Sequence, residues 1–193
     1  TSDRRGISMT VSPLAPTDLG TLPTIAGVQL TSFAAGLRYQ GRPDLLLGVF
    51  EPGTTVAGTF TTSKCPSAPV DWCQAIIESG TARSLVVNAG NANAFTGRHG
   101  EESTRVTATS VATALGIEAD QVYLASTGVI GEPLETAPIV AAIPDLVGGL
   151  AVADHENLTS AAHAIRTTDT FPKYRGSEVE LPSGQAEPAL PQV

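Results

Sequence analysis

The sequence predicts an α/β fold in which mixed sheets are covered by helices. Short apolar runs at residues 84–87 and 122–125 have the character of buried strands, and each ends in small and polar residues. Between such runs lie longer stretches whose apolar residues recur at helical spacing. A chain of 193 residues is long enough to bury a core within a single domain.

The strands are expected early in the chain and again around its middle. Extended segments are predicted at 27–31, 34–39, 45–50, 56–62, 84–88 and 122–125. Residues 1–24 are rich in Thr, Ser and Pro, so the chain is expected to begin disordered and to become ordered near Val28. The predicted organisation is an N-terminal segment over 1–24, one α/β domain over 25–184 and a tail over 185–193.

Four helices are expected, at 70–79, 100–115, 135–143 and 155–165. The second is supported by side chains at helical spacing and by Gly116, which stops the pattern. The residues at that spacing are Val106, Ser110, Ala114, Val111 and Leu115. Gly148 and Gly149 are expected to form a flexible join before the last helix.

Charge and hydropathy exclude several classes of partner. The formal net charge of −8 argues against binding to nucleic acid or to an anionic membrane surface, because both need a basic face. No apolar stretch has the length of about 18 residues that a membrane helix requires. The N-terminal residues lack the pattern of a secretory signal, so the expected location is the cytoplasm.

Cysteine and histidine positions indicate neither a disulfide framework nor a metal site. Cys65 and Cys73 are too few for a disulfide scaffold and have no histidine at metal-ligand spacing, so both are expected to be free thiols. His99, His155 and His163 follow no nucleophile pattern and are interpreted as surface or capping residues. None of them is placed in the catalytic set.

Three polar segments stand out as candidate sites. Residues 86–97 carry three asparagines after an apolar strand, and their uncharged amides suit a polar, zwitterionic small molecule. Residues 126–131 follow another strand and place a hydroxyl beside a glycine, as an oxyanion hole needs, because its donors must closely approach a negative oxygen. Residues 164–173 place hydroxyls and a carboxylate after an Ala-rich helix. Considered singly, each segment is equally an ordinary turn.

Together, these three segments resemble the ornithine acetyltransferase family, the bifunctional glutamate N-acetyltransferases. The resemblance spans residues 22–184 and matches the amino-terminal, or α, subunit of such an enzyme. Upstream, residues 27–30 and 34–38 resemble the opening hairpin of the family, and 44–50 and 57–64 resemble the strands that follow. The resemblance implies mixed sheets covered by helices, in a fold like that of N-terminal-nucleophile aminopeptidases.

The resemblance also implies an activity. Family members are made as a precursor that cuts itself before a threonine, and this threonine becomes the nucleophile of a β chain. It accepts acetyl from N-acetylornithine and passes it to glutamate in arginine biosynthesis. By resemblance, Thr127 and Gly128 form the oxyanion hole and Thr168 contacts the substrate. No cofactor is implied, and acetyl-coenzyme A is the alternative acetyl donor.

The tail departs from the family pattern. Residues 185–193 contain no glycine-rich segment, no lysine and no threonine where the family continues to its cleavage sequence. The nucleophile is therefore expected on a separate β chain, and truncation, a shifted reading frame and divergence are alternative origins of the tail. An α subunit without that partner is expected to expose apolar sheet edges and to aggregate or oligomerise.

Two other functions remain alternatives on the sequence alone. The first is a non-catalytic remnant that binds a small amino-acid-like ligand or a partner. The second is the subunit of an N-terminal-nucleophile amidohydrolase, which releases acyl groups to water.

Overall fold

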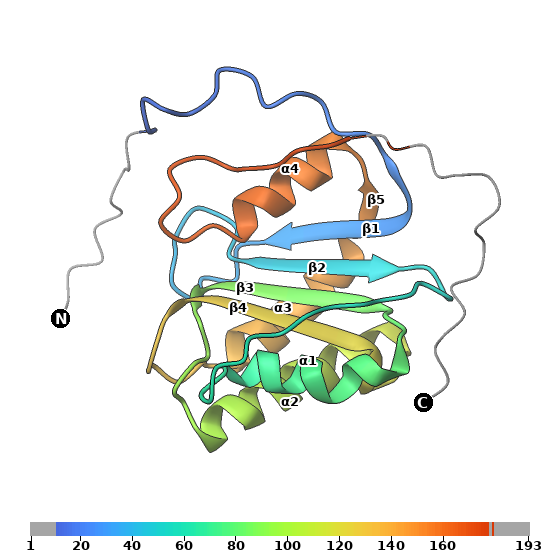
Figure 1. Cartoon of the computed structure of the whole chain (residues 1–193), viewed down its shortest axis with the longest axis vertical. Helices are drawn as coiled ribbons and strands as arrows, with labels where there is room; N and C mark the ends of the chain where they lie inside the picture. Colours follow the sequence, from blue (N-terminus) through green and yellow to red (C-terminus); the bar gives the residue numbers. More distant parts are fainter. Residues whose placement is uncertain (1–10, 178, 180–193) are drawn as a thin grey trace.

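A five-stranded mixed sheet organises the computed structural model, which describes residues 11–177 and 179 (Figure 1). Its strands lie in the order β4-β3-β2-β1-β5. They are β1 (Ile25–Phe33), β2 (Leu45–Phe50), β3 (Ser84–Asn91), β4 (Val122–Val129) and β5 (Ala151–Ala153). The helices are α1 (Ala68–Ile76), α2 (Arg98–Leu115), α3 (Ala137–Gly148) and α4 (His155–Ala164), with short 3-10 helices η1 (Ile77–Ser79) and η2 (Ala119–Gln121). The predicted α/β class is confirmed.

The direction of the strands sets where their ends meet. β1 pairs antiparallel with β2 and β5, and β2 pairs antiparallel with β3. Only β3 and β4 are parallel among the described strands, and α2 makes the crossover between them. The carboxyl ends of β3 and β4 therefore lie next to each other at one end of the sheet.

Alternating side chains of the central strands build a core on each face of the sheet. Leu45, Leu47 and Val86 are buried on one face, in a cluster that includes apolar residues of α2 and α3. Leu46 and the partly buried Val87 belong to a second cluster with residues of α4. Because both faces are covered, these strands are apolar on both sides, which explains their strong strand signal.

Helix α1 covers the open edge of β4. The indole Nε1 of Trp72 donates to the carbonyl of Val122 at 2.9 Å. The thiol of Cys73 donates to the carbonyl of Leu124 at 3.3 Å, and the amide of Leu124 approaches the same sulfur at 3.5 Å. Side chains of α1 thus form hydrogen bonds with backbone groups of β4 that would otherwise be open to pairing with another strand. Both cysteines are free as predicted, Cys65 exposed and Cys73 buried.

The predicted strand over 34–39 is wrong, and so is the hairpin expected from it. This segment belongs to the loop between β1 and β2, and β1 pairs with β2 instead. The buried carboxylate of Asp44 accepts hydrogen bonds from the amides of Ala35 and Leu37 at 2.8 and 2.7 Å. Because these amides donate to Asp44, they are not available for hydrogen bonds to a neighbouring strand.

Other predicted boundaries also change. Residues 56–62 form no strand, since the neighbouring pairing is a single bridge between Thr55 and Thr81. Strand β5 was not predicted because three residues are too short for an alternating pattern to appear. Helix α3 contains Pro144 and continues past its predicted end at 143 to Gly148. Gly148 therefore belongs to the helix and not to the flexible connection predicted at 148–149.

The buried face of α2 is more polar than predicted. Ser103, Thr104 and Thr107 are buried there, together with Val111, whereas Ala114 is exposed. The hydroxyls of these three polar residues donate to helix carbonyls, so burying them leaves no donor unsatisfied. A pattern based on apolar residues could not find this face.

Two further expectations concern the ends of the chain and membranes. Residues 11–24 hold no helix or strand, and the tail over 185–193 lies outside the described residues. The expected family strand and turn over 177–184 lie mostly outside them as well. Among the described residues, no helix combines the length and apolar character needed to cross a membrane.

Candidate functional site

The ends of β3 and β4 bring two of the three polar segments together. In the register of the parallel pair, Asn88 lies opposite Ser126, and Gly90 lies opposite Gly128. Beyond the pair, the amide of Ala92 donates to the carbonyl of Val129 at 2.8 Å. Residues 126–129, predicted as a turn after the strand, are instead its last residues. Thr127 is half-buried and Gly128 is exposed at this end of the sheet.

Two glycines make a close backbone contact there. Gly128 has φ of 137°, and a Cβ on it would lie 2.3 Å from the carbonyl carbon of Gly90 and 2.5 Å from the amide nitrogen of Asn91. Gly90 has φ of 112°, and a Cβ on it would lie 2.6 Å from the Cβ of Arg38. Neither position accepts a side chain without displacement of its neighbours. The family resemblance pointed to Gly128, whereas the contact of Gly90 with it could not be predicted because the two residues are far apart in the chain.

The loop between β1 and β2 closes over this contact. Asp44 holds the loop at its base, and Arg38 from the loop extends to Glu132, where Nη1 and Oε2 are 3.1 Å apart. Both side chains of this ion pair are about half exposed, so its contribution to stability is small. The ion pair connects the loop between β1 and β2 to the turn that follows β4.

All three asparagines bind other groups of the protein through their side chains. Asn93 is buried, and its Nδ2 lies within hydrogen-bond distance of the carbonyl of Gly100 and the hydroxyls of Ser103 and Thr104. Asn91 donates through Nδ2 to the carbonyl of Glu132 at 3.0 Å, and its Oδ1 accepts the amide of Asn93 at 2.7 Å. The interpretation that these amides bind a small molecule is therefore wrong for Asn93 and is replaced by a structural role.

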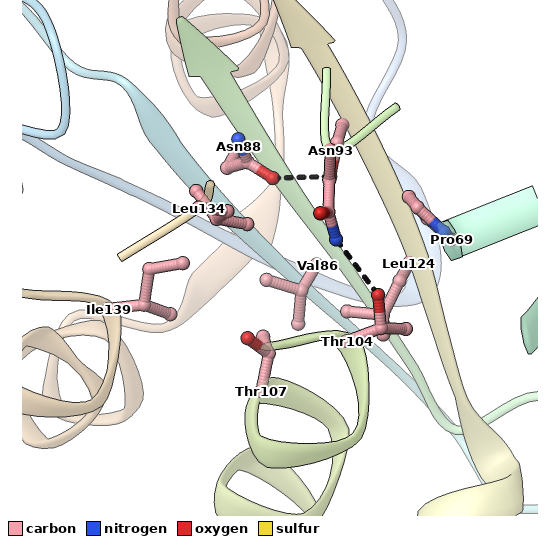
Figure 2. Close-up of a pocket in the computed structure, with 10 residues that line it drawn as sticks. Pro69, Val86, Asn88, Asn93, Thr104, Thr107, Leu124, Leu134 and Ile139 are labelled. Carbon is pink, nitrogen blue, oxygen red and sulfur yellow. Dashed lines mark hydrogen bonds between the residues drawn. The ribbon is translucent and has the colours of Figure 1, made fainter. Parts of the chain in front are cut away.

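A small cavity lies between the sheet and α2. It has a volume of about 10 Å³, and Asn88, Asn93 and Thr104 are among the residues that line it (Figure 2). Figure 2 also shows the bond from Asn93 to Thr104 on its wall. A space of this size holds about one water molecule and excludes an amino acid. This cavity is therefore not a binding site for a molecule of that size.

Thr168 is exposed and lies after α4. Figure 1 shows this segment at the same end of the sheet as the carboxyl ends of β3 and β4. Within the part of the chain that the structure describes, no hydrogen bond joins Thr168 to Thr127 or Gly128. Thr127 and Gly128 are neighbours in the chain, and the fold places the segment of Thr168 at the same end of the sheet, with no hydrogen bond to either among the described residues (Figure 1).

Cationic side chains surround the segment that carries Thr168. Arg42 stacks on the ring of Tyr39 at 3.6 Å and donates to the carbonyl of Arg166 at 2.7 Å. Burial, and then the charge of Arg42, lower the pKa of Arg166. Burial is also the main cause that lowers the pKa of His163, followed by the charges of both arginines. His163 lies in the last turn of α4.

The chemistry available at the strand ends is hydrogen-bond donation without charge. A glycine amide at an exposed strand end can closely approach a negative oxygen, and the neighbouring threonine adds a hydroxyl. Across the described residues, no group of three His, Cys, Asp or Glu side chains could hold a metal ion.

These features define an α/β protein in which a glycine-supported strand end presents uncharged donors. The chain belongs to the ArgJ family, whose model matches residues 29–188. It is 51% identical over 179 residues to the arginine biosynthesis bifunctional protein ArgJ of Nitrobacter winogradskyi, and 52% identical over 176 residues to that of Bradyrhizobium diazoefficiens. Each alignment covers 91% of this chain, and the chain spans 42% of the length of these curated relatives.

Solved structures support the same assignment. The ornithine acetyltransferase of Mycobacterium tuberculosis, solved in complex with ornithine, superposes with a TM-score of 0.73 at 36% identity. That match covers 77% of this chain and 79% of the solved chain. The ArgJ protein of Bacillus halodurans gives a TM-score of 0.71 at 30% identity, covering 79% and 78% of the two chains. The family resemblance and the fold predicted from the sequence are both confirmed.

Proposed function

We propose that this chain is the α part of an acetyltransferase that moves acetyl from N-acetyl-L-ornithine to L-glutamate in arginine biosynthesis. Its relatives are named as arginine biosynthesis proteins, and one solved relative was crystallised with ornithine. The observation in this chain that carries the proposal is the contact between Gly128 and Gly90, which packs two backbones together without side chains at an exposed strand end.

The proposed role of the strand end is to stabilise negative charge. When a nucleophile attacks the acetyl carbonyl, its oxygen becomes an oxyanion, and the hydroxyl of Thr127 and the amide of Gly128 donate to it. The same donors serve twice, because transfer of the acetyl group to glutamate passes through a second tetrahedral intermediate. Thr168 is proposed to contact the substrate from the neighbouring surface.

The proposed nucleophile is a threonine on a β chain, which forms an acetyl-threonine intermediate with its own α-amino group as the base. The chain spans 42% of the length of its curated relatives, which leaves ample sequence in them for such a chain. The proposal requires neither metal nor cofactor, with acetyl-coenzyme A as the alternative acetyl donor. The complete enzyme is expected to act in the cytoplasm.

The experiment is a transfer assay on the complete gene product, with N-acetylornithine carrying a labelled acetyl group and glutamate as the acceptor. Labelled N-acetylglutamate is the expected product. Thr127→Ala should lower kcat by about 10²- to 10³-fold, the usual effect of removing one oxyanion donor, whereas Thr127→Ser keeps a hydroxyl and should retain most of the activity.

Other outcomes distinguish the alternatives. Release of labelled acetate with no transfer to glutamate would favour the amidohydrolase. Absence of both reactions, together with binding of ornithine measured by calorimetry, would favour a non-catalytic binding protein.

A further inference from the structure

We propose that Asn88 is a positioning residue that acts through Ser126 to hold the peptide of Thr127 and Gly128 in place. The inference rests on the proposed function and adds a residue to it. Asn88 is 5% exposed and lies two residues after Val86 in β3, on the same buried face of the strand. A buried amide in an apolar strand is costly unless its hydrogen bonds are satisfied.

Both polar groups of Asn88 are used, and each reaches one of the two strand ends. Its Oδ1 accepts from the hydroxyl of Ser126 at 2.6 Å, and its Nδ2 donates to the carbonyl of Asn91 at 2.9 Å. Ser126 directly precedes Thr127, and Asn91 directly follows Gly90. One side chain therefore holds the chain on both sides of the contact between Gly90 and Gly128.

The backbone ladder alone does not specify the alignment at this point. The register of β3 and β4 is regular up to Gly90 and Gly128, after which Asn91 aligns with both Thr127 and Val129. An irregular ladder permits more than one arrangement of the strand ends. The bond between Asn88 and Ser126 lies on the regular side of this irregularity, two pairs before Gly128, where a side-chain link restricts slippage.

Small displacements matter for oxyanion donors. Such groups work when they are held within about 0.5 Å of the productive geometry, and a displacement of about 1 Å costs about 10²-fold in rate. A loosened strand end would weaken stabilisation of the transition state more than binding of the substrate. Loss of the link should therefore lower kcat and leave KM nearly unchanged.

The neighbouring asparagine network provides a matched control. Ser103 is a buried serine hydrogen-bonded to Asn93, as Ser126 is bonded to Asn88. Ser103 accepts from Asn93, in the loop after β3, and donates to Gly100 in α2, so these bonds involve no residue of β4. Ser103→Ala and Ser126→Ala thus remove the same chemical group from an asparagine link, in one case on α2 and in the other on β4, directly before Thr127.

The test compares these variants in the complete gene product, using the transfer of acetyl from N-acetylornithine to glutamate. Ser126→Ala is expected to lower kcat by about 10- to 10²-fold with KM within about twofold of the wild type. Ser103→Ala is expected to lower the thermal midpoint by a similar amount and to keep kcat within about twofold. Ser126→Cys, with a weaker donor of similar shape, should give an intermediate kcat and serves if the alanine variant does not fold.

A double variant tests whether Asn88 acts through Ser126. If it does, Ser126→Ala should cause little further loss of kcat in an Asn88→Ala background. Equal losses of kcat in the Ser126→Ala and Ser103→Ala variants would overturn the proposal. So would a change in KM alone, or full additivity in the double variant.

A second readout separates this proposal from the proposed function. If the wild-type protein transfers no acetyl, the proposed function fails, and amide hydrogen exchange over residues 122–131 then decides the positioning role. Faster exchange in Ser126→Ala than in Ser103→Ala would support it. Equal exchange rates in the two variants would overturn it.

Discussion

Gly128 lies so close to Gly90 that a Cβ on Gly128 would stand 2.3 Å from the carbonyl carbon of Gly90. The two glycines occupy paired positions at the ends of parallel strands, and both have positive φ. Gly128 is exposed at this strand end, and its Cα packs against the backbone of Gly90 and Asn91.

Replacing Gly128 should therefore be far more costly than replacing a glycine that only needs positive φ. Gly128→Ala is expected to lower the free energy of unfolding by roughly 3 kcal/mol or more, because the methyl group meets backbone that cannot move aside. Gly131 has φ of 82°, and a Cβ on it would meet no atom within 4 Å, so Gly131→Ala should cost about 1 kcal/mol. Urea unfolding of both variants measures the difference, and equal losses would contradict the contact.

The buried carboxylate of Asp44 should be a major determinant of the loop that carries Arg38. Asp44→Asn replaces one acceptor oxygen by an NH₂ group that would face backbone amides, so a loss of roughly 2–4 kcal/mol is expected. The exposed Asp18 accepts one amide, from Gly20, and Asp18→Asn should change stability by less than about 0.5 kcal/mol. Chemical denaturation compares the two variants. A small effect at Asp44 would mean that the loop is held by other contacts.

His163 should make the protein sensitive to mild acid. Burial and the charges of Arg166 and Arg42 lower its pKa in the folded state, so the unfolded chain binds a proton more readily. The contribution of neutral His163 to the free energy of unfolding is fully present above the unfolded pKa of about 6.5 and is lost as the pH falls below that value.

The prediction for His163→Gln follows from that sign. The decrease in unfolding free energy between about pH 8 and about pH 5 should be smaller in the variant than in the wild type. Urea titrations at both pH values measure it. An unchanged decrease would show that other groups cause the acid sensitivity.

The two cysteines should differ in reactivity. Cys65 is exposed, whereas Cys73 is buried, and burial raises the pKa of its thiol despite the bond to Leu124. A thiol reagent such as dithionitrobenzoate is expected to modify Cys65 alone in the native protein and both residues in urea. Cys65→Ser provides the control, since it should remove the native reaction and retain the one seen in urea. Rapid native modification of that variant would contradict the burial of Cys73.

Part of the candidate site could be predicted because its signal is local. Ser126, Thr127 and Gly128 come directly after an apolar run, which marked them as a candidate turn, and the family resemblance then singled out Thr127 and Gly128. The burial of Asn88 could also be predicted, because the alternation of side chains along the strand places it on the same buried face as Val86. Its partner was not readable, because Ser126 lies 38 residues away in the chain.

The amino-acid pattern by itself determined the α/β class, most of the helices, the main apolar strands and the family. These features depend on local periodicity and on long motifs, which a single sequence carries. The tertiary structure alone decided that residues 34–39 form a loop on Asp44, that Asn93 faces inward, and that Gly90 supports Gly128. Each of these depends on which distant group satisfies a hydrogen bond or occupies a space, and local patterns do not contain that information.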